Sequence, residues 1–117
     1  MPVVCDFIQI IGDTIQPIPQ TAAGVEVPLP DFNTSGREAQ LTALLLLSAR
    51  NLAGSAQVFI NNHHVGDITA TSGAAFSTQL IAVAGNQINN GNNEIVLKAV
   101  SDPFELKDVI CFFHQAA

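Results

Sequence analysis

The stretch Glu94-Ile95-Val96-Leu97-Lys98-Ala99-Val100-Ser101 decides the fold class of this 117-residue chain. Its side chains alternate, with Ile95, Leu97 and Ala99 on one side and Val96, Lys98 and Val100 on the other. A period of two is typical of a β-strand, because successive side chains of a strand point to opposite faces. The alternation therefore predicts an extended segment whose one face packs against a second layer.

Similar strand signals recur along the chain and are separated by turn formers such as Asn90-Gly91. In one of them Phe76, Thr78 and Leu80 alternate with Ser77 and Gln79. The expected strands are Val3–Ile11, Gln40–Leu52, Ala56–Ile60, Val65–Ala70, Ala75–Val83, Glu94–Ser101 and Leu106–His114. Seven short strands of this kind predict an all-β fold, a single-domain antiparallel β-sandwich (jelly roll) over residues 1–117.

Two segments are less regular. Between Gly12 and Gly36 four prolines restrict the backbone, so we expect an ordered excursion with one edge strand at Gly24–Val27. Gln40–Leu52 is rich in Ala and Leu, and Ser35 with Glu38 resembles a helix capping box. A helix there would be apolar on every side, so we favour a strand that is buried on both faces.

Composition excludes several functions. The net charge is −6 and the four basic residues, Arg37, Arg50, Lys98 and Lys107, are scattered, which argues against binding to nucleic acid or to an anionic membrane. The apolar run Leu41–Ala49 is too short for membrane insertion. No signal peptide is recognisable, so we expect a soluble protein that is cytoplasmic or exported by a non-classical route. Only 12% of residues are charged, as in many assembly subunits and extracellular modules.

Three motifs resemble the galactose-binding-domain-like jelly roll, a family that includes many carbohydrate-binding modules. Residues 58–66, Val-Phe-Ile-Asn-Asn-His-His-Val-Gly, are similar to its V-x-V-N-G-x-x-V-G hairpin, with Asn62 in place of glycine. Residues 88–97 resemble its L-x-x-G-x-N-x-I-x-L turn and strand, with Asn93 at the asparagine position. Residues 104–113 resemble its closing strand, with Asp108 in the acidic position. Asparagine tolerates the left-handed conformation, so the hairpin turn should survive.

The resemblance implies that the first and last strands are neighbours, which would bring Cys5 near Cys111. From the residues alone, two buried free thiols are favoured over a disulfide. The resemblance also implies a lectin-like, carbohydrate-binding role through loops at one end of the sandwich. The candidate ligand-binding residues are Asn61, Asn62, His63, His64, Asn90 and Asn92. The chain lacks the Trp and Tyr that usually form sugar platforms, and ordinary turn chemistry explains the asparagines equally well.

No catalytic residues and no cofactor are predicted, because no nucleophile–base–orienter pattern is recognisable. A metal site at His63 or His64 with Asp67 would support a metal-assisted enzyme, but solvated turn residues are the simpler interpretation. Structural calcium would draw on Asp6, Asp13, Asp31 and Asp108, which lack EF-hand spacing. The leading hypothesis is thus a non-enzymatic module that binds carbohydrate or a protein partner. The alternative is a structural subunit that forms homo-oligomers or part of a particle or filament.

Overall fold

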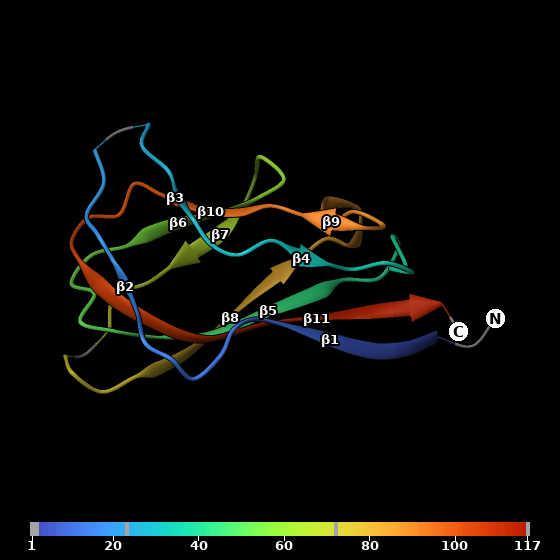
Figure 1. The fold of residues 1–117 in the computed structure, drawn as a ribbon, viewed down its shortest axis with the longest axis horizontal. Helices are drawn as coiled ribbons and strands as arrows, with labels where there is room; N and C mark the ends of the chain where they lie inside the picture. The colour runs from blue at the N-terminus through green and yellow to red at the C-terminus, as the bar shows by residue number, and fades with distance from the viewer. Residues whose placement is uncertain (1–2, 23, 72, 117) are drawn as a thin grey trace.

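A computed structural model describes residues 3–22, 24–71 and 73–116, the side chains of residues 3 and 116 excepted. Over these residues the chain forms strands and one short 3₁₀ helix (Figure 1). The elements are β1 Val3–Ile11, β2 Gln16–Ile18, β3 Val27–Pro28, β4 Phe32–Asn33, β5 Ala43–Arg50, β6 Ala56–Ile60, β7 His63–Ile68, β8 Ser77–Val83, η1 Gly85–Gln87, β9 Asn92–Asn93, β10 Ile95–Lys98 and β11 Phe104–Ala116.

Two antiparallel sheets pack face to face, as Figure 1 shows. The first sheet has the order β1-β11-β5-β8, and β2 adds to the same edge of β11 as β1. The second sheet has the order β3-β10-β6-β7, and β4 pairs with β9 in a small separate ribbon. The expected antiparallel β-sandwich, one compact all-β domain, is confirmed. The expected closeness of the first and last strands is confirmed as well, because β1 pairs with β11 along its length.

The core lies between the two sheets and is almost entirely aliphatic. From the first sheet, Leu45, Leu47 and Leu106 are fully or almost fully buried, and from the second sheet Val58 and Ile95 are too. These are the alternate residues of each strand, so the period-two pattern correctly indicates which side chains meet across the sandwich. The burial of these aliphatic side chains between the sheets is the main contribution to the stability of such a fold.

The prediction that the segment around β5 is a strand buried on both faces is only partly right. Its inward residues are buried, but Leu44 and Leu46 on the opposite face are only partly buried, so β5 is not buried on both faces. The reason is that no element within the described ranges covers the outer face of the first sheet. The helix alternative is also excluded for this segment, which is extended from Ala43 to Arg50.

Most strand boundaries differ by a few residues from those predicted, and in three places the difference has a clear structural cause. The proline-rich excursion contains three short strands, β2, β3 and β4, and its edge strand is Val27–Pro28 instead of Gly24–Val27. Strand β10 ends at Lys98 because Ala99 adopts φ 51°, which reverses the alternation. As a result Ala99 is exposed and Val100 is buried. Strand β11 continues past a second irregularity at Asp108, where φ is 52° and the register with β5 shifts.

The two cysteines lie on opposite faces of the first sheet. Cys111 is fully buried, pairs with Ile8 of β1, and has its pKa raised to about 12 by burial. Cys5 pairs with His114 and is exposed. Both thiols are free, so the prediction of two buried thiols is right for Cys111 and wrong for Cys5. On β11, His114, the partner of Cys5, lies three residues from Cys111. Because side chains alternate between the two faces of a strand, this odd separation places the two thiols on opposite faces of the sheet.

Candidate functional site

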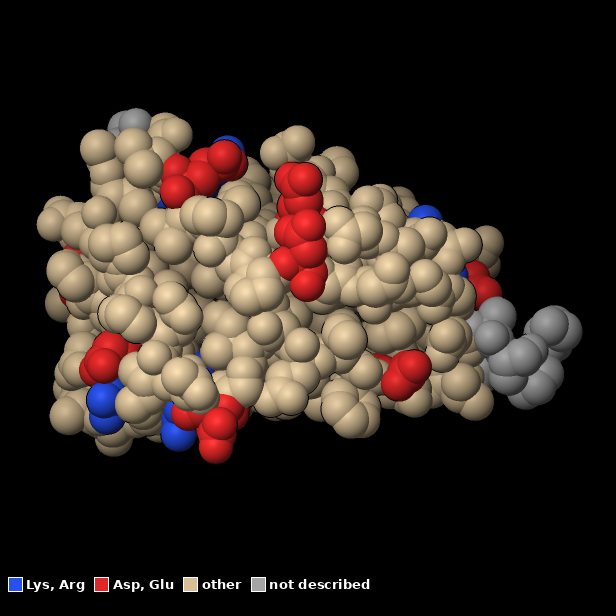
Figure 2. All heavy atoms as spheres, in the orientation of Figure 1, with Lys and Arg blue, Asp and Glu red and all other residues tan. Residues whose placement is uncertain are grey.

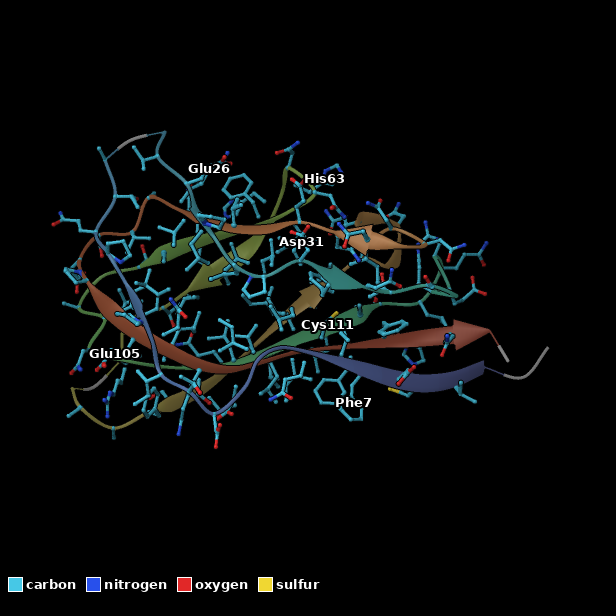
Figure 3. The ribbon with its side chains drawn as sticks, in the orientation of Figure 1. Phe7, Glu26, Asp31, His63, Glu105 and Cys111 are labelled. Atoms are coloured by element: carbon cyan, nitrogen blue, oxygen red, sulfur yellow. The ribbon has the colours of Figure 1, made fainter. Side chains whose placement is uncertain are left out.

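The hairpin nominated as a binding site is a tight two-residue turn. Asn61 and Asn62 adopt φ 51° and 68°, the left-handed conformation that a type I′ turn needs at both positions. The expected survival of the turn with Asn62 is therefore confirmed. His63 and His64, predicted to lie in the turn, are instead the first residues of β7, opposite Ile60 and Phe59. Both histidines are exposed, and Figure 3 shows His63 on the outer side of the second sheet.

The asparagine-rich segment is held together by the fully buried side chain of Asn93. Its Oδ1 accepts hydrogen bonds from the backbone N–H of Asn89 at 2.7 Å and from Nδ2 of Asn61 at 2.9 Å. Its Nδ2 donates to Thr34 Oγ1 at 2.8 Å and to the carbonyls of residues 32 and 91 at 3.2 Å. One amide thus ties β4, β9 and the β6–β7 turn into a single polar cluster.

Three of the nominated asparagines contribute to the same internal structure, whereas Asn93 itself was not among the predicted binding residues. Asn61 also donates to the Gln87 carbonyl at 3.1 Å and accepts from the Glu94 N–H at 3.0 Å, so that both of its N–H groups and one of the two acceptor positions of its oxygen are used. Asn90 Oδ1 accepts from the Gly36 N–H at 2.7 Å. Asn92 is exposed and donates to an Asp31 carboxylate oxygen at 3.1 Å. The nominated residues therefore lie near one end of the sandwich, but much of their hydrogen-bonding capacity is already used.

The ring of Phe59, which lies beside the hairpin, is already in contact with other side chains of the protein. The His64 ring stacks on Phe59 with centroids 5.0 Å apart, and Lys98 Nζ lies 4.4 Å from the same ring centroid. His64 Nε2 contacts Asp67 Oδ1 at 2.8 Å, and Lys98 is 3.4 Å from Glu26. These contacts form a small polar ladder on the outer face of the second sheet and leave little free aromatic surface for a sugar to stack on.

Within the ranges that the structure describes, the side chains that commonly bind metal ions do not form a cluster. No group of three or more His, Cys, Asp or Glu side chains among these residues is placed to hold a metal ion. The His64–Asp67 pair involves only these two side chains, and His63 precedes His64 on β7 without joining the pair. The described part of the chain also contains no helix with the length and apolar character that crossing a bilayer requires.

The most unusual surface lies elsewhere, on the outer face of the first sheet. Strand register places two rows of side chains across it, Phe7–Phe112–Leu44–Ala82 and Gln9–Ile110–Leu46–Leu80, and all of these residues except Gln9 are apolar. Phe7 is 61% exposed and Leu80 is 58% exposed. Figure 3 shows Phe7 projecting from β1 away from the second sheet. We call Phe7, Leu44, Leu46, Leu80, Ile110 and Phe112 the apolar face.

A hollow of about 490 Å³ opens beside this face. It is lined by Cys5, Thr42, Ala43, Leu44, Phe112 and His114, and we call it the apolar hollow. The Phe7 and Phe112 rings are neighbours, with centroids 6.1 Å apart, so an exposed aromatic side chain stands directly beside the hollow. Nδ1 of His114 is buried there and has no hydrogen-bond partner among the described residues. A second hollow, of about 610 Å³, lies at the other end around Pro17, Pro103 and Phe104.

Charge on the outer face is confined to one end. Arg50 Nε contacts Glu105 Oε1 at 2.8 Å, and Arg50 and Lys107 lie 4.5 and 4.4 Å from the Phe76 ring centroid. The Arg50 hydrogen bond is the largest of the effects that hold the pKa of Glu105 below its ordinary value. Figure 3 labels Glu105 at the end opposite the termini, and Figure 2 shows blue and red atoms together at that end. Figure 2 also shows a red-and-blue cluster along the upper side, a red stripe near the middle and smaller red patches towards the termini, with uncharged surface between them.

Sequence reasoning did not nominate the apolar face. The signal was present, because Leu41–Ala49 is apolar on both strand faces and Phe76, Thr78 and Leu80 share one face. At the level of the sequence, burial of both faces within the chain explains the two-sided pattern equally well. The structure shows that one of the two faces is open, which makes the same pattern a signal for an interaction surface.

Comparison with known proteins gives a likeness of fold only. No protein-family model and no curated protein matches the chain. Among solved structures, a chain from the structure of infectious bursal disease virus Gx strain is similar, with a TM-score of 0.52 and 12% sequence identity. The match covers 98% of this chain and 32% of that chain, so this chain spans about a third of the viral chain's length. The chain is thus an antiparallel β-sandwich that is similar in fold to part of a chain from a virus structure.

Proposed function

We propose that this chain is a non-catalytic structural subunit that forms homo-oligomers or contributes to a larger particle or filament. The observation that carries the proposal is the uncovered apolar face of the first sheet. Monomeric proteins rarely leave a contiguous patch of large apolar side chains in water, because burying it is favourable by about 25 cal/mol for each Å². A partner that covers the patch removes this cost.

Two further observations support an assembly role. The fold is similar to part of a chain from a virus structure, and virus particles are built from repeated protein contacts. Charged residues make up only 12% of the chain, and the charge of the outer face is confined to its Arg50–Glu105 end. Charge depletion at the centre of a surface is typical of protein–protein interfaces.

Carbohydrate binding finds no comparable support. The Asn61 amide makes three hydrogen bonds within the protein, which use both of its N–H groups, and the Phe59 ring is in contact with His64 and Lys98. A sugar ligand needs free polar groups around an accessible apolar platform. Neither the fold comparison nor these contacts favour it, so the assembly role is the better-supported function.

Light scattering coupled to size exclusion tests the proposal. We expect a mass that is a multiple of the 12.3 kDa chain mass and that falls towards one chain on dilution. A glycan array run in parallel should give no specific binding. A strictly monomeric protein at millimolar concentration would contradict the assembly role, because apolar association of this kind strengthens with concentration by mass action.

A further inference from the structure

The outer face of the first sheet carries both a protruding side chain and a recess of suitable size. Phe7 is 61% exposed, and the adjacent apolar hollow of about 490 Å³ is large enough to accept a phenyl ring. Phe112 connects the two, since it contacts Phe7 and also lines the hollow. A surface that holds a protrusion beside a matching recess is complementary to itself under a two-fold rotation.

The charge distribution favours a second copy over a charged partner. The chain has a net charge of −6, so two copies repel each other in general. On the outer face, however, Arg50 and Glu105 neutralise each other at 2.8 Å, and Lys107 Nζ lies 3.9 Å from a carboxylate oxygen of Asp108. Two copies that meet through this face therefore keep most of their carboxylates outside the contact.

The size of the face is adequate for a dimer contact. Strands lie about 4.8 Å apart and rise about 3.3 Å per residue, so four strands over the eight residues of β5 cover roughly 19 × 26 Å, or about 500 Å². Side chains make the accessible area larger than this flat footprint, and β1 and β11 extend it further. Specific protein–protein interfaces bury at least about 600 Å² of accessible surface on each partner, and this face is large enough to supply that area.

The open edge of the same sheet is a poorer place for a second copy. Strand β1 is one of the two edge strands of this sheet, and the Phe7 N–H donates to the Asp6 carboxylate at 2.8 Å. A copy that paired edge to edge would have to displace this bond and bring the Asp6 carboxylates of both chains together. Charged residues on edge strands are a common protection against such pairing.

From these observations we infer that the outer face binds a second copy of this chain in a two-fold symmetric contact, with Phe7 of each copy seated in the apolar hollow of the other. The inference rests on the proposed assembly function and specifies its partner and surface. In this arrangement Leu44 and Phe112 form the walls around the inserted ring. Cys5, which lines the hollow, becomes inaccessible when the contact forms.

The test compares Phe7→Glu with Val25→Glu. Val25 is 50% exposed and lies outside the first sheet, so it is a matched apolar-to-acidic control. By light scattering over a concentration series, we expect wild type and Val25→Glu to form dimers or even-numbered assemblies. We expect Phe7→Glu to raise the dissociation constant by at least about tenfold, the effect of losing one central contact. Leu80→Glu, on the same face, should weaken association as well, and circular dichroism should show that every variant is folded.

The free thiols provide an independent readout. Cys5 is exposed in the single chain and Cys111 is buried with its pKa raised to about 12, so Cys5 is the thiol that iodoacetamide should modify in the native protein. We expect the alkylation rate of Cys5, followed by mass spectrometry, to fall as wild-type concentration rises through the dissociation constant. In Phe7→Glu the rate should stay high at all concentrations.

The outcomes separate the inference from the function on which it rests. An oligomer that persists in both Phe7→Glu and Leu80→Glu, with Cys5 fully reactive, would refute this contact and leave the assembly role standing. A wild-type monomer with reactive Cys5 at every concentration would overturn both. Flotation of monomers with neutral phosphatidylcholine vesicles, lost in Phe7→Glu, would assign the face to a lipid surface and overturn the two-fold contact.

Discussion

The replacement of Asn93 by alanine tests whether the asparagine-rich end of the sandwich is a structural cluster. The Asn93 amide has five hydrogen-bond contacts within 3.2 Å, two at its oxygen and three shared by its two N–H groups. Counting four full bonds at about 1 kcal/mol net each gives a loss of roughly 4 kcal/mol. Because water can enter the vacated space and satisfy some groups, we expect Asn93→Ala to lower the free energy of unfolding by about 3–4 kcal/mol.

Urea denaturation followed by circular dichroism, at a concentration where the protein is monomeric, measures this change by linear extrapolation. Asn92→Ala is the matched control, since Asn92 is the exposed neighbour and its side chain makes a single hydrogen bond to Asp31. We expect the control to change stability by no more than about 0.5 kcal/mol. If Asn93→Ala lowered the free energy of unfolding by less than about 1 kcal/mol, the buried amide would not hold the three segments together and the structural explanation would fail.

Two further predictions concern the loop that contains Asp102 and the contact between β7 and β8. The hydroxyl of Ser101 and the N–H of Ala53 hold the pKa of Asp102 below its usual 3.8, so the charged form stabilises the fold above that pH and this stabilisation is lost as the pH falls. The stability difference between wild type and Asp102→Asn should therefore be largest at neutral pH and should shrink below pH 3.8 in acid titrations. An alanine Cβ at Gly66 would lie 2.7 Å from Cγ2 of Ile81, so Gly66→Ala should cost about 1–3 kcal/mol in urea unfolding. A similar loss in an Ile81→Ala background would show that this contact is not the cause.

The sequence predicted the layered fold because β-strands and turns are largely local features. The alternation at Ile95, Val96 and Leu97 requires only that neighbouring side chains point to opposite faces, and the structure confirms it. The Asn61-Asn62 turn was recognisable for the same reason, since its left-handed backbone depends on the two residues themselves.

The candidate binding residues were less predictable. Whether an asparagine is free for a ligand depends on which backbone groups other segments bring near it. Asn93 contacts Thr34, 59 positions away in the chain, and Asn61 contacts Asn93, 32 positions away. Such distant partners are set by sheet order and register, which a single sequence does not display.

By itself the sequence determined that this chain forms strands and that Leu41–Ala49 is apolar on both sides. Only the tertiary structure decided that one of those sides faces solvent, because burial depends on which sheet has a layer above it. The first sheet is covered on its inner face by the β3-β10-β6-β7 sheet, whereas its outer face, with Phe7 and Leu80, meets no other element of the described chain. The hydrophobic effect acts on that exposed area as strongly as on the core, and this is the physical basis of the proposed assembly.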